Sequence, residues 1–303
     1  MKFKLHSTYK SKPLVSIIIN CYNGGKYLKE AIDSVFSQTY KNWEIIFWDN
    51  HSQDNSVEIL NSYNDKRIKY FYAPKHTHLG EARNSAIKKA GGEWLAILDC
   101  DDIWYKNKLD AQLREVKDDV GMIYSRVKLR SEESCFDSFM TKSADDKIYP
   151  KFKRLPSGDI FSELLYECFI PCPSVLIRKD LFFKVGTINK SLRVAEDYDI
   201  FLKVARISKV IALDRVLCIY RIHGNNLTKD NYESSFQESL GLVSAYSLEK
   251  NIAYNIIYWK LKYLKYLIRR GDYKKFILFT LKLNIFSILL MIKHRYLTIK
   301  NKV

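Results

Sequence analysis

The sequence VSIIIN, residues 15–20, is followed at once by CYNGG, residues 21–25, and these two segments decide the fold class. The first is an apolar, β-branched run without polar alternation, which is typical of a strand covered on both faces. The two glycines end it, and residues 26–38 then show helical spacing. The apolar face of that predicted helix consists of Leu28, Ile32, Val35 and Phe36. A buried strand, a short turn and an amphipathic helix predict the first unit of an α/β fold.

The alternation of strand and helix continues to residue 116. Extended segments are predicted at residues 43–48, 68–73 and 94–98, and helices at residues 57–63, 79–90 and 107–116. Four such units in a row predict a Rossmann-like, mostly parallel sheet flanked by helices, whose ligands bind beyond the carboxyl ends of the strands.

Polar side chains stand where these predicted strands end. Asn20 and Tyr22 follow the first strand, Asp49 and Asn50 follow the second, and DCDD, residues 99–102, follows the fourth. Because the carboxyl ends of parallel strands meet at one edge of a sheet, we expect these side chains to converge on one rim.

The acidic cluster DCDD predicts a metal site. A D-x-D triplet alone is weak evidence, since about one is expected by chance in a chain this rich in Asp, and a second occurs at residues 197–199. The N-cap of a helix starting at residues 103–104 would use one carboxylate, whereas Asp99, Asp101 and Asp102 supply three. Crowded carboxylates repel one another unless a cation lies among them, and Mg²⁺ or Mn²⁺ bridging to phosphate is the usual solution.

Four blocks of the chain resemble the inverting family 2 glycosyltransferases of GT-A fold. They are residues 15–56, 81–102, 195–205 and 220–228, in the order of that family, and the resemblance runs from about Pro13 to Thr228. It implies a metal-dependent enzyme that moves a sugar from a nucleotide-diphosphate donor to an acceptor hydroxyl.

The resemblance also implies roles on the donor side. Asn20, Tyr22, Asp49 and Asn50 would border the nucleotide, and Arg83 would approach the nucleotide or its diphosphate. The D-x-D pair would be Asp99 and Asp101, with Asp102 and His223 as further metal ligands. The alternative for His223 is a turn residue before Gly224. The family commonly has aspartate where this chain has Asn50; because an amide both accepts and donates, a UDP-sugar is favoured but a guanine or cytosine nucleotide stays open.

On the acceptor side the resemblance assigns the general base to Asp197, with Glu196 beside it. Inverting transfer needs a group that takes the proton of the acceptor hydroxyl. The same acidic letters would equally suit the N-terminus of a helix, where the helix dipole favours negative charge. We also expect a helix capped at Ser157 and a polar loop over residues 131–153 near the site.

Two other classes of protein fit parts of this pattern. A sugar nucleotidyltransferase also joins a nucleotide-binding sheet to metal-binding carboxylates, but it would normally carry a basic, glycine-rich loop after the first strand, where this chain has NCYNGGKY. A catalytically silent binding protein of the same fold is the second alternative.

The net charge of +16 is concentrated at the C-terminus, because residues 250–303 hold thirteen Lys or Arg and one acid, Asp272. We expect a catalytic domain over residues 1–228, with a nucleotide-sugar half (about 13–130) and an acceptor half (about 131–228), and a basic amphipathic helical extension over 229–303. No apolar run is long enough to span a bilayer, and the first residues lack a secretory signal. These features favour a cytoplasmic protein.

Helical spacing from Tyr246 to Leu267 predicts one helix of the extension, with Ile268 on its apolar face. A turn at residues 269–273 and a second helix over 276–294 follow. The extension would bind the anionic inner face of the plasma membrane, the catalytic domain or a second copy of the chain, and these readings stay open. No nucleic-acid module accompanies the charge, so we expect no nucleic acid as partner.

Overall fold

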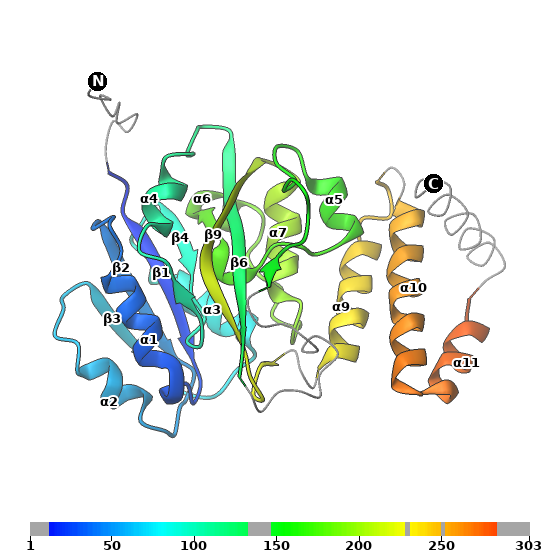
Figure 1. The fold of residues 1–303 in the computed structure, drawn as a ribbon, viewed down its shortest axis with the longest axis horizontal. Coiled ribbons are helices and arrows are strands. Elements are labelled where there is room, and N and C mark those ends of the chain that lie inside the picture. Colours follow the sequence, from blue (N-terminus) through cyan, green and yellow to red (C-terminus); the bar gives the residue numbers. More distant parts are fainter. Residues whose placement is uncertain (1–11, 133–146, 228–230, 250–251, 284–303) are drawn as a thin grey trace. The chain divides into compact units, whose positions relative to one another are not determined.

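The computed structural model describes residues 12–132, 147–227, 231–249 and 252–283 (Figure 1). The chain divides into two compact units. One comprises residues 1–161 and 169–229, and the other comprises residues 162–168 and 230–303. Residues 162–168, which we expected in the acceptor half of the catalytic domain, therefore group with the C-terminal helices.

A single mixed sheet runs through the first unit. Its strands are β1 (Val15–Cys21), β2 (Trp43–Asp49), β3 (Ile68–Tyr72), β4 (Trp94–Ile97), β5 (Ile103–Trp104), β6 (Val120–Ser131), β7 (Ile148–Tyr149), β8 (Leu176–Arg178) and β9 (Lys209–Ile222). Their order is β3-β2-β1-β4-β8-β6-β9-β5, with β7 beside β6. The first four strands of this order are parallel, while β8 pairs antiparallel with both β4 and β6. The predicted mostly parallel sheet of GT-A type is confirmed.

Helices cover this sheet, as Figure 1 shows. They are α1 (Gly25–Phe36), α2 (Ser56–Asn61), α3 (Leu79–Ile87), α4 (Lys108–Leu113), α6 (Lys179–Lys184) and α7 (Glu196–Ala205). Every residue of β1 is buried, and α1 packs its predicted apolar face, including Leu28, Ile32 and Val35, into the same core. Full burial of each such side chain stabilises the fold by about 1.5–3 kcal/mol.

The strand register brings the carboxyl ends of β1 to β4 to one rim. Cys21 is paired with Asp49, and Asp49 with Tyr72, while the Leu98 amide donates to the Ile18 carbonyl. The chain therefore leaves β1, β2 and β4 at neighbouring points, and the expected convergence of these loops is confirmed.

Two expectations about local structure are wrong. Residues 103–104 form strand β5, paired with β9, and the next helix, α4, begins only at Lys108. Ser157 caps no helix: its hydroxyl donates to the Val210 carbonyl and accepts from the Ala212 amide, and α5 (Phe161–Tyr166) begins four residues later. Of the predicted loop 131–153, β6 includes residue 131 and β7 covers 148–149, while 133–146 lie outside the described residues.

The second unit contains α9 (Tyr232–Ser244), α10 (Ile252–Arg270) and α11 (Tyr273–Leu281). The predicted turn between the last two is confirmed, with Gly271 in the left-handed region at φ 70°. α10 packs on the segment 162–168, where the rings of Tyr166 and Tyr258 stack with centroids 3.8 Å apart. Ile268, expected on the buried face, is exposed. The second helix, predicted over 276–294, instead begins at Tyr273 and ends at Leu281, before residues 282–283. Residues 284–303 lie outside the described part.

No helix within the described ranges combines the length and the apolar character needed to cross a membrane.

Candidate functional site

The loops after β1 and β2 are tied to each other at the rim. The Asn23 amide donates to the Ser52 hydroxyl over 3.0 Å, and the Asn23 side-chain oxygen accepts from the Gln53 amide over 2.8 Å. A side chain at Gly24 would place its Cβ only 2.7 Å from the Cys100 sulfur. Glycine is therefore required where the first loop presses against the acidic segment.

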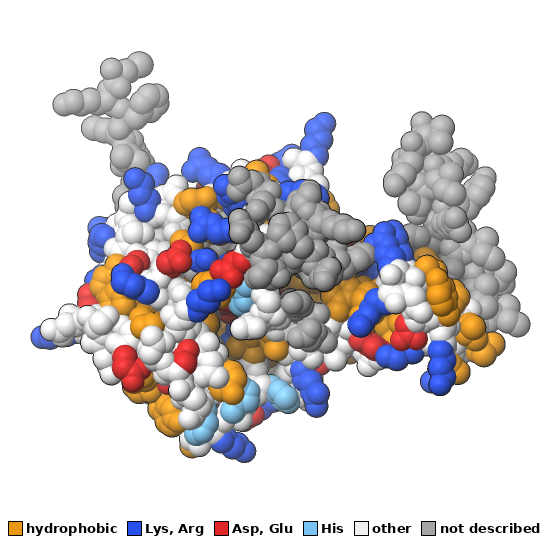
Figure 2. All heavy atoms as spheres, turned by 60° about the horizontal axis from the view of Figure 1, so that its bottom comes forward, with side chains coloured by type: hydrophobic (Ala, Val, Ile, Leu, Met, Phe, Trp, Pro, Cys, Tyr) orange, Lys and Arg blue, Asp and Glu red, His pale blue; other side chains and the backbone are white. Residues whose placement is uncertain are grey.

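Tyr22 and His76 form an aromatic pair on this rim. Tyr22 is 49% exposed, and its ring centroid lies 4.1 Å from that of His76. Figure 2 shows histidine side chains gathered along the lower part of one face of the molecule. An exposed ring at a strand end can pack on a nucleobase, so the geometry suits the role predicted for Tyr22.

Asp49 is the last residue of β2 and Asn50 follows it, and the side chains of both are held by hydrogen bonds within the protein. Asp49 accepts from the Ser52 amide over 2.8 Å and from the Tyr70 hydroxyl over 3.1 Å. The Asn50 side chain donates to the Thr77 carbonyl over 2.8 Å and accepts from the Thr77 amide over 3.3 Å and its hydroxyl over 3.1 Å. Both the donor and the acceptor function of the Asn50 amide are thus engaged with the loop that carries His76.

Asn20 has the opposite character. Its side chain is 8% exposed, and neither its amide nitrogen nor its oxygen has a hydrogen-bond partner among the described residues. A buried, unpaired amide costs about 1–3 kcal/mol. Such a group at the end of β1 is suited to receive a polar ligand.

Pairing of β5 with β9 brings the acidic cluster to the residues after β9. Because Ile103 is paired with Ile219, the backbone amide of Arg221 reaches the Asp102 carboxylate at 2.8 Å. His223 Nε2 lies 2.8 Å from Asp101 Oδ2. Sequence positions more than a hundred residues apart therefore meet at the rim.

The three carboxylates differ in their surroundings. Burial, opposed by Arg83 and assisted by the charge of Asp101, raises the pKa of Asp99. Burial, with the charges of Asp101 and Asp99, holds the pKa of Asp102 well above its ordinary value. Asp102 is only 1% exposed and its Oδ2 has no partner among the described residues. Asp102 is therefore the most enclosed of the three carboxyl groups, and its Oδ2 is a buried acceptor without a donor in the described part of the chain.

Asp99 and Asp101 fit a divalent cation as a pair. Each keeps about a quarter of its side chain exposed, at 26% and 22%. No three His, Cys, Asp or Glu side chains of the described ranges are already arranged around a cation position. This set nevertheless suits Mg²⁺ or Mn²⁺, because such ions are commonly held by one or two carboxylates together with substrate phosphates.

His223 acts on Asp101 in this arrangement. Its Nδ1 accepts from the Asn225 amide over 3.2 Å, so in the neutral ring the proton is on Nε2, which then donates to Asp101. Direct ligation of a cation through Nε2 would move the ring proton to Nδ1 and would break both of these hydrogen bonds. The geometry therefore favours a positioning role over the predicted role as ligand.

Arg83 joins the strand tip to the start of α7. It is 2% exposed; its two terminal nitrogens donate to Asp99 over 2.6 Å and to Glu196 over 2.7 Å. Each of these nitrogens uses one N–H in its contact, and Nε has no hydrogen-bond partner among the described residues, so Arg83 holds two carboxylates and keeps donors for a further acceptor. The nearby Asn84 side chain exchanges two hydrogen bonds with the backbone of Ile188, which fixes the chain leading to α7.

Glu196 and Asp197 form the first turn of α7, with different pKa values. Burial raises the pKa of Glu196 to about 8 and that of Asp197 to about 6, in each case against the effect of Arg83. When neighbouring carboxyl groups are separated in this way, the one with the lower pKa ionises first and is the better base at neutral pH. The other member of the second triplet, Asp199, accepts from the Asn189 amide and from Lys203, so 197–199 is not a metal pair.

His76 and Thr77 were missed by the reasoning from sequence. They lie between β3 and α3, beyond the carboxyl end of β3. The rule that ligands bind beyond the carboxyl ends of parallel strands, applied to the third strand as it was to the first, second and fourth, would have named this loop.

The chain is similar to known proteins over more than half of its length. Residues 16–183, more than half of the chain, match the family model for glycosyl transferase family 2. An uncharacterized glycosyltransferase of Rickettsia typhi is 36% identical over 220 residues, covering 71% of this chain and 66% of the relative. The chain belongs to glycosyl transferase family 2.

A second relative has a more specific name. The UDP-Glc:alpha-D-GlcNAc-diphosphoundecaprenol beta-1,3-glucosyltransferase WfgD of Escherichia coli is 28% identical over 225 residues, which cover 73% of this chain and 81% of WfgD. The match to the Rickettsia typhi protein spans just under two thirds of that protein's length, and the match to a Rickettsia felis relative about a third, 35%.

Solved structures share the fold. TarS of S. aureus in complex with UDP-GlcNAc superposes with a TM-score of 0.63 at 19% identity, covering 92% of this chain and 78% of the TarS chain. The mannosyltransferase PcManGT of Pyrobaculum calidifontis, in complex with GDP-Man and Mn²⁺, has a TM-score of 0.59 at 14% identity, covering 96% and 81%.

Proposed function

We propose that this protein is an inverting glycosyltransferase that moves a sugar from a nucleotide-diphosphate donor to an acceptor hydroxyl. The observation that carries the proposal is the double contact of Arg83 with Asp99 and Glu196. Through Asp99 and Glu196, the buried guanidinium of Arg83 links the strand tip that carries the D-x-D pair to the first turn of α7, which carries the candidate base Asp197.

In the proposed step, the acceptor oxygen attacks the anomeric carbon of the sugar from the face opposite the diphosphate. The bond between that carbon and the diphosphate oxygen breaks, and the nucleoside diphosphate leaves with the electron pair. Asp197 takes the proton of the acceptor hydroxyl, for which a base with pKa near the working pH is efficient. Arg83 keeps the neighbouring Glu196 in place.

Asp99 and Asp101 would hold Mn²⁺ or Mg²⁺ with the donor diphosphate, and Asn20 would bond the nucleotide part. The cation would offset the negative charge that develops on the departing diphosphate. PcManGT, which shares the fold, was solved with GDP-Man and Mn²⁺. His223 would orient Asp101 through its 2.8 Å hydrogen bond.

A UDP-sugar is the favoured donor, and a glycolipid or glycan the favoured acceptor. TarS was solved with UDP-GlcNAc, and the name of WfgD specifies UDP-Glc and a diphosphoundecaprenol-linked acceptor. We infer a role in surface polysaccharide or glycolipid assembly, at the cytoplasmic face of the plasma membrane. The basic extension 250–303 would attach there peripherally, since a Lys or Arg near an anionic surface contributes about 1 kcal/mol.

The test is a panel of nucleotide sugars incubated with the protein, Mn²⁺ or Mg²⁺ and a lipid-linked sugar acceptor. Nucleoside diphosphate release with glycosylated acceptor is expected, with loss of both on chelation of the cation. Asp101→Ala and Asp197→Asn should each abolish transfer while the unfolding midpoint stays close to that of the unchanged protein. Ser191→Ala, an exposed position before α7, is the control and should keep activity.

Other outcomes would overturn the proposal. Consumption of a nucleoside triphosphate with pyrophosphate release would identify a sugar nucleotidyltransferase. Donor binding without turnover on any acceptor would identify a binding protein. Substantial transfer by purified Asp197→Asn would remove Asp197 as the base.

A further inference from the structure

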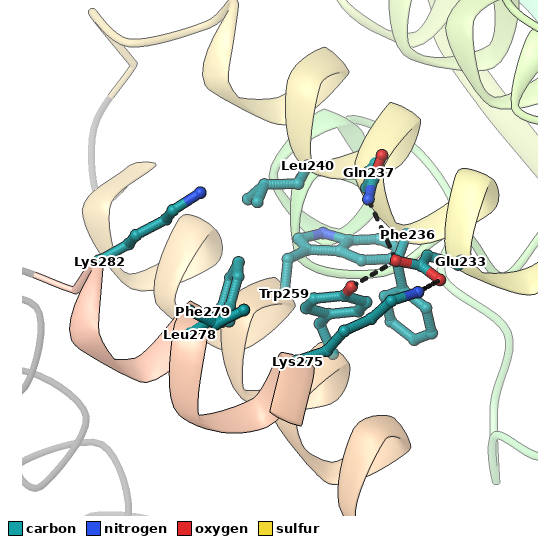
Figure 3. A pocket seen from close by; sticks show the side chains of 10 residues that line it. Glu233, Phe236, Gln237, Leu240, Trp259, Lys275, Leu278, Phe279 and Lys282 are labelled. Carbon is teal, nitrogen blue, oxygen red and sulfur yellow. Dashed lines mark hydrogen bonds and ion pairs between the residues drawn. The ribbon is translucent and has the colours of Figure 1, made fainter. Parts of the chain in front are cut away.

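A pocket of about 260 Å³ lies between α9, α10 and α11 in the second unit (Figure 3). Its walls are mainly aromatic and aliphatic: Phe236, Leu240, Trp259, Tyr263 and Phe279. The volume is below the roughly 300 Å³ at which pockets for whole small molecules begin. An apolar space of this size suits part of a hydrocarbon chain better than a sugar or a nucleotide.

Two lysines and one glutamate line the pocket, and in the described part of the chain they leave one ammonium group without an ion pair. Glu233 accepts from the Tyr263 hydroxyl over 2.9 Å and from Lys275 over 2.7 Å, as Figure 3 shows, so both of its oxygens are engaged. Lys282 also lines the pocket, and within the described ranges its ammonium group makes no ion pair. A ligand with an apolar chain and an anionic head would satisfy both parts of this site.

Among the described residues, nothing covers an apolar surface of α11 beside the pocket. It buries no residue, and Tyr273, Ile277, Leu278 and Leu281 are 61%, 55%, 52% and 77% exposed. Contiguous exposed apolar side chains on a soluble protein usually mark a surface that binds something. Leu278 is both part of this surface and part of the pocket lining, so the two features are continuous.

Charge decides which occupant fits. Residues 250–303 carry thirteen Lys or Arg and one acid, and Figure 2 shows basic and hydrophobic side chains together on the part formed by these helices. A second copy of this surface would bring like charges together, and the chain's own residues 284–303 contain four Lys or Arg and no acid. An anionic lipid surface supplies both the opposite charge and the apolar phase.

We infer that the pocket receives one hydrocarbon chain of an anionic phospholipid, whose phosphate lies on Lys282 while the exposed side chains of α11 enter the membrane interface. Only the role of lipid binding rests on the proposed function: it would hold the transferase at the membrane that contains a lipid-linked acceptor. Lipid binding itself is independent of catalysis.

Trp259 provides a direct probe, because it lines the pocket and the other four tryptophans belong to the first unit. The full chain is mixed with vesicles of phosphatidylglycerol or phosphatidylcholine whose acyl chains carry bromine, a fluorescence quencher of short range. We expect quenching of Trp259 by brominated phosphatidylglycerol, little by brominated phosphatidylcholine, and loss of the quenched component in Trp259→Phe.

Two matched pairs of variants separate the pocket from the surface around it. Leu240→Phe fills the pocket and should remove quenching, whereas Leu248→Phe makes the same change at a fully exposed position and should not. Lys282→Glu should remove the preference for phosphatidylglycerol, whereas Lys265→Glu changes the net charge equally at an exposed position outside the pocket lining and should retain it.

Equal quenching in Leu240→Phe and the unchanged protein would overturn the inference, because the chain would then not enter the pocket. Absence of quenching in the full chain would mean that a protein segment, from this chain or another copy, fills the space, and would overturn it as well. Asp197→Asn is expected to lose transfer and keep quenching. A failure of the proposed function is therefore distinguishable from a failure of lipid binding.

Discussion

Glu196 and Asp197 are adjacent acids whose surroundings differ. Glu196 is fixed by Arg83 and is almost fully buried, whereas Asp197 is partly exposed and bonds the Tyr198 amide over 2.7 Å. Burial raises the pKa of Glu196 to about 8 and that of Asp197 to about 6. Near neutral pH, Glu196 is therefore mainly protonated and Asp197 mainly ionised. The order of the two pKa values supports Asp197, the acid to which the resemblance assigned the role of base, over Glu196.

The turnover rate should consequently fall as pH falls through about 6, because protonated Asp197 cannot accept the proton of the acceptor hydroxyl. The measurement is nucleoside diphosphate release at saturating donor and acceptor across the pH range. The unfolding midpoint, followed in parallel, shows whether the protein stays folded at the acidic end. A rate that stays constant between pH 5 and 8 would contradict the assignment, given a pKa of about 6.

Asn50→Asp should destabilise the protein although the family commonly has aspartate there. The new carboxylate would face the Thr77 carbonyl, now 2.8 Å from the Asn50 amide nitrogen, with no proton to donate. Loss of a buried hydrogen bond that leaves an unsatisfied group costs about 1–3 kcal/mol. Urea unfolding measures the change. Asn64→Asp, at an exposed position between α2 and β3, is the control, and its effect on stability should stay near zero.

The sequence predicted which residues lie at the rim better than it predicted the contacts that each of them makes. Asp99 and Asp101 were placed correctly at a strand tip because strand ends are local in sequence. The partner of Arg83 was not predictable, since Glu196 lies 113 residues away and reaches it only through the packing of α7 on α3. The contact of Asn50 with Thr77 likewise depends on where the loop after β3 folds back.

At the scale of elements, the parallel half of the sheet was predictable and the antiparallel half was not. β1, β2 and β4 are short apolar runs whose burial determines their conformation. β5 is only two residues long, and its pairing with β9 is set by residues 218 and 219, which local pattern does not connect to it. That pairing places His223 at Asp101, so the site could not be completed from local sequence.

Two glycines within helices should respond in opposite directions to replacement by alanine. At Gly80 in α3 a Cβ would lie 2.9 Å from the Ile188 side chain and 3.2 Å from the Glu196 Cβ. Overpacking there should cost about 1–3 kcal/mol and displace the start of α7. At Gly241 in α9 the space is open, and alanine should stabilise by about 0.5–1 kcal/mol through helix propensity.

Unfolding curves and transfer rates of both variants check this prediction. Gly80→Ala should lose both stability and turnover, and Gly241→Ala should gain stability with turnover unchanged. A stabilised Gly80→Ala variant with full activity would show that α3 and α7 can separate without moving the candidate base.

At the scale of the whole molecule, the positive charge is distributed unevenly along the chain, which the overall composition does not reveal. The net charge is +16, but thirteen of the fifty Lys and Arg fall in residues 250–303 beside a single acid. Sedimentation with phosphatidylglycerol vesicles should therefore decrease steeply as salt is raised, because at about 0.1 M salt charges interact over only about 10 Å. Sedimentation that does not change with salt would place the attraction in apolar contacts alone.

The contacts of Arg83 also bear on how this protein could be recombined with its relatives. The guanidinium of Arg83 contacts two carboxylates, Asp99 and Glu196. In the sequence, Asp99 precedes the long strand β6 and Glu196 follows it. A chimaera that takes its donor-side segment from one relative and its acceptor-side segment from another would preserve this junction only if all three side chains were compatible. Exchange of acceptor specificity by swapping segments is thus constrained by a residue on the donor side.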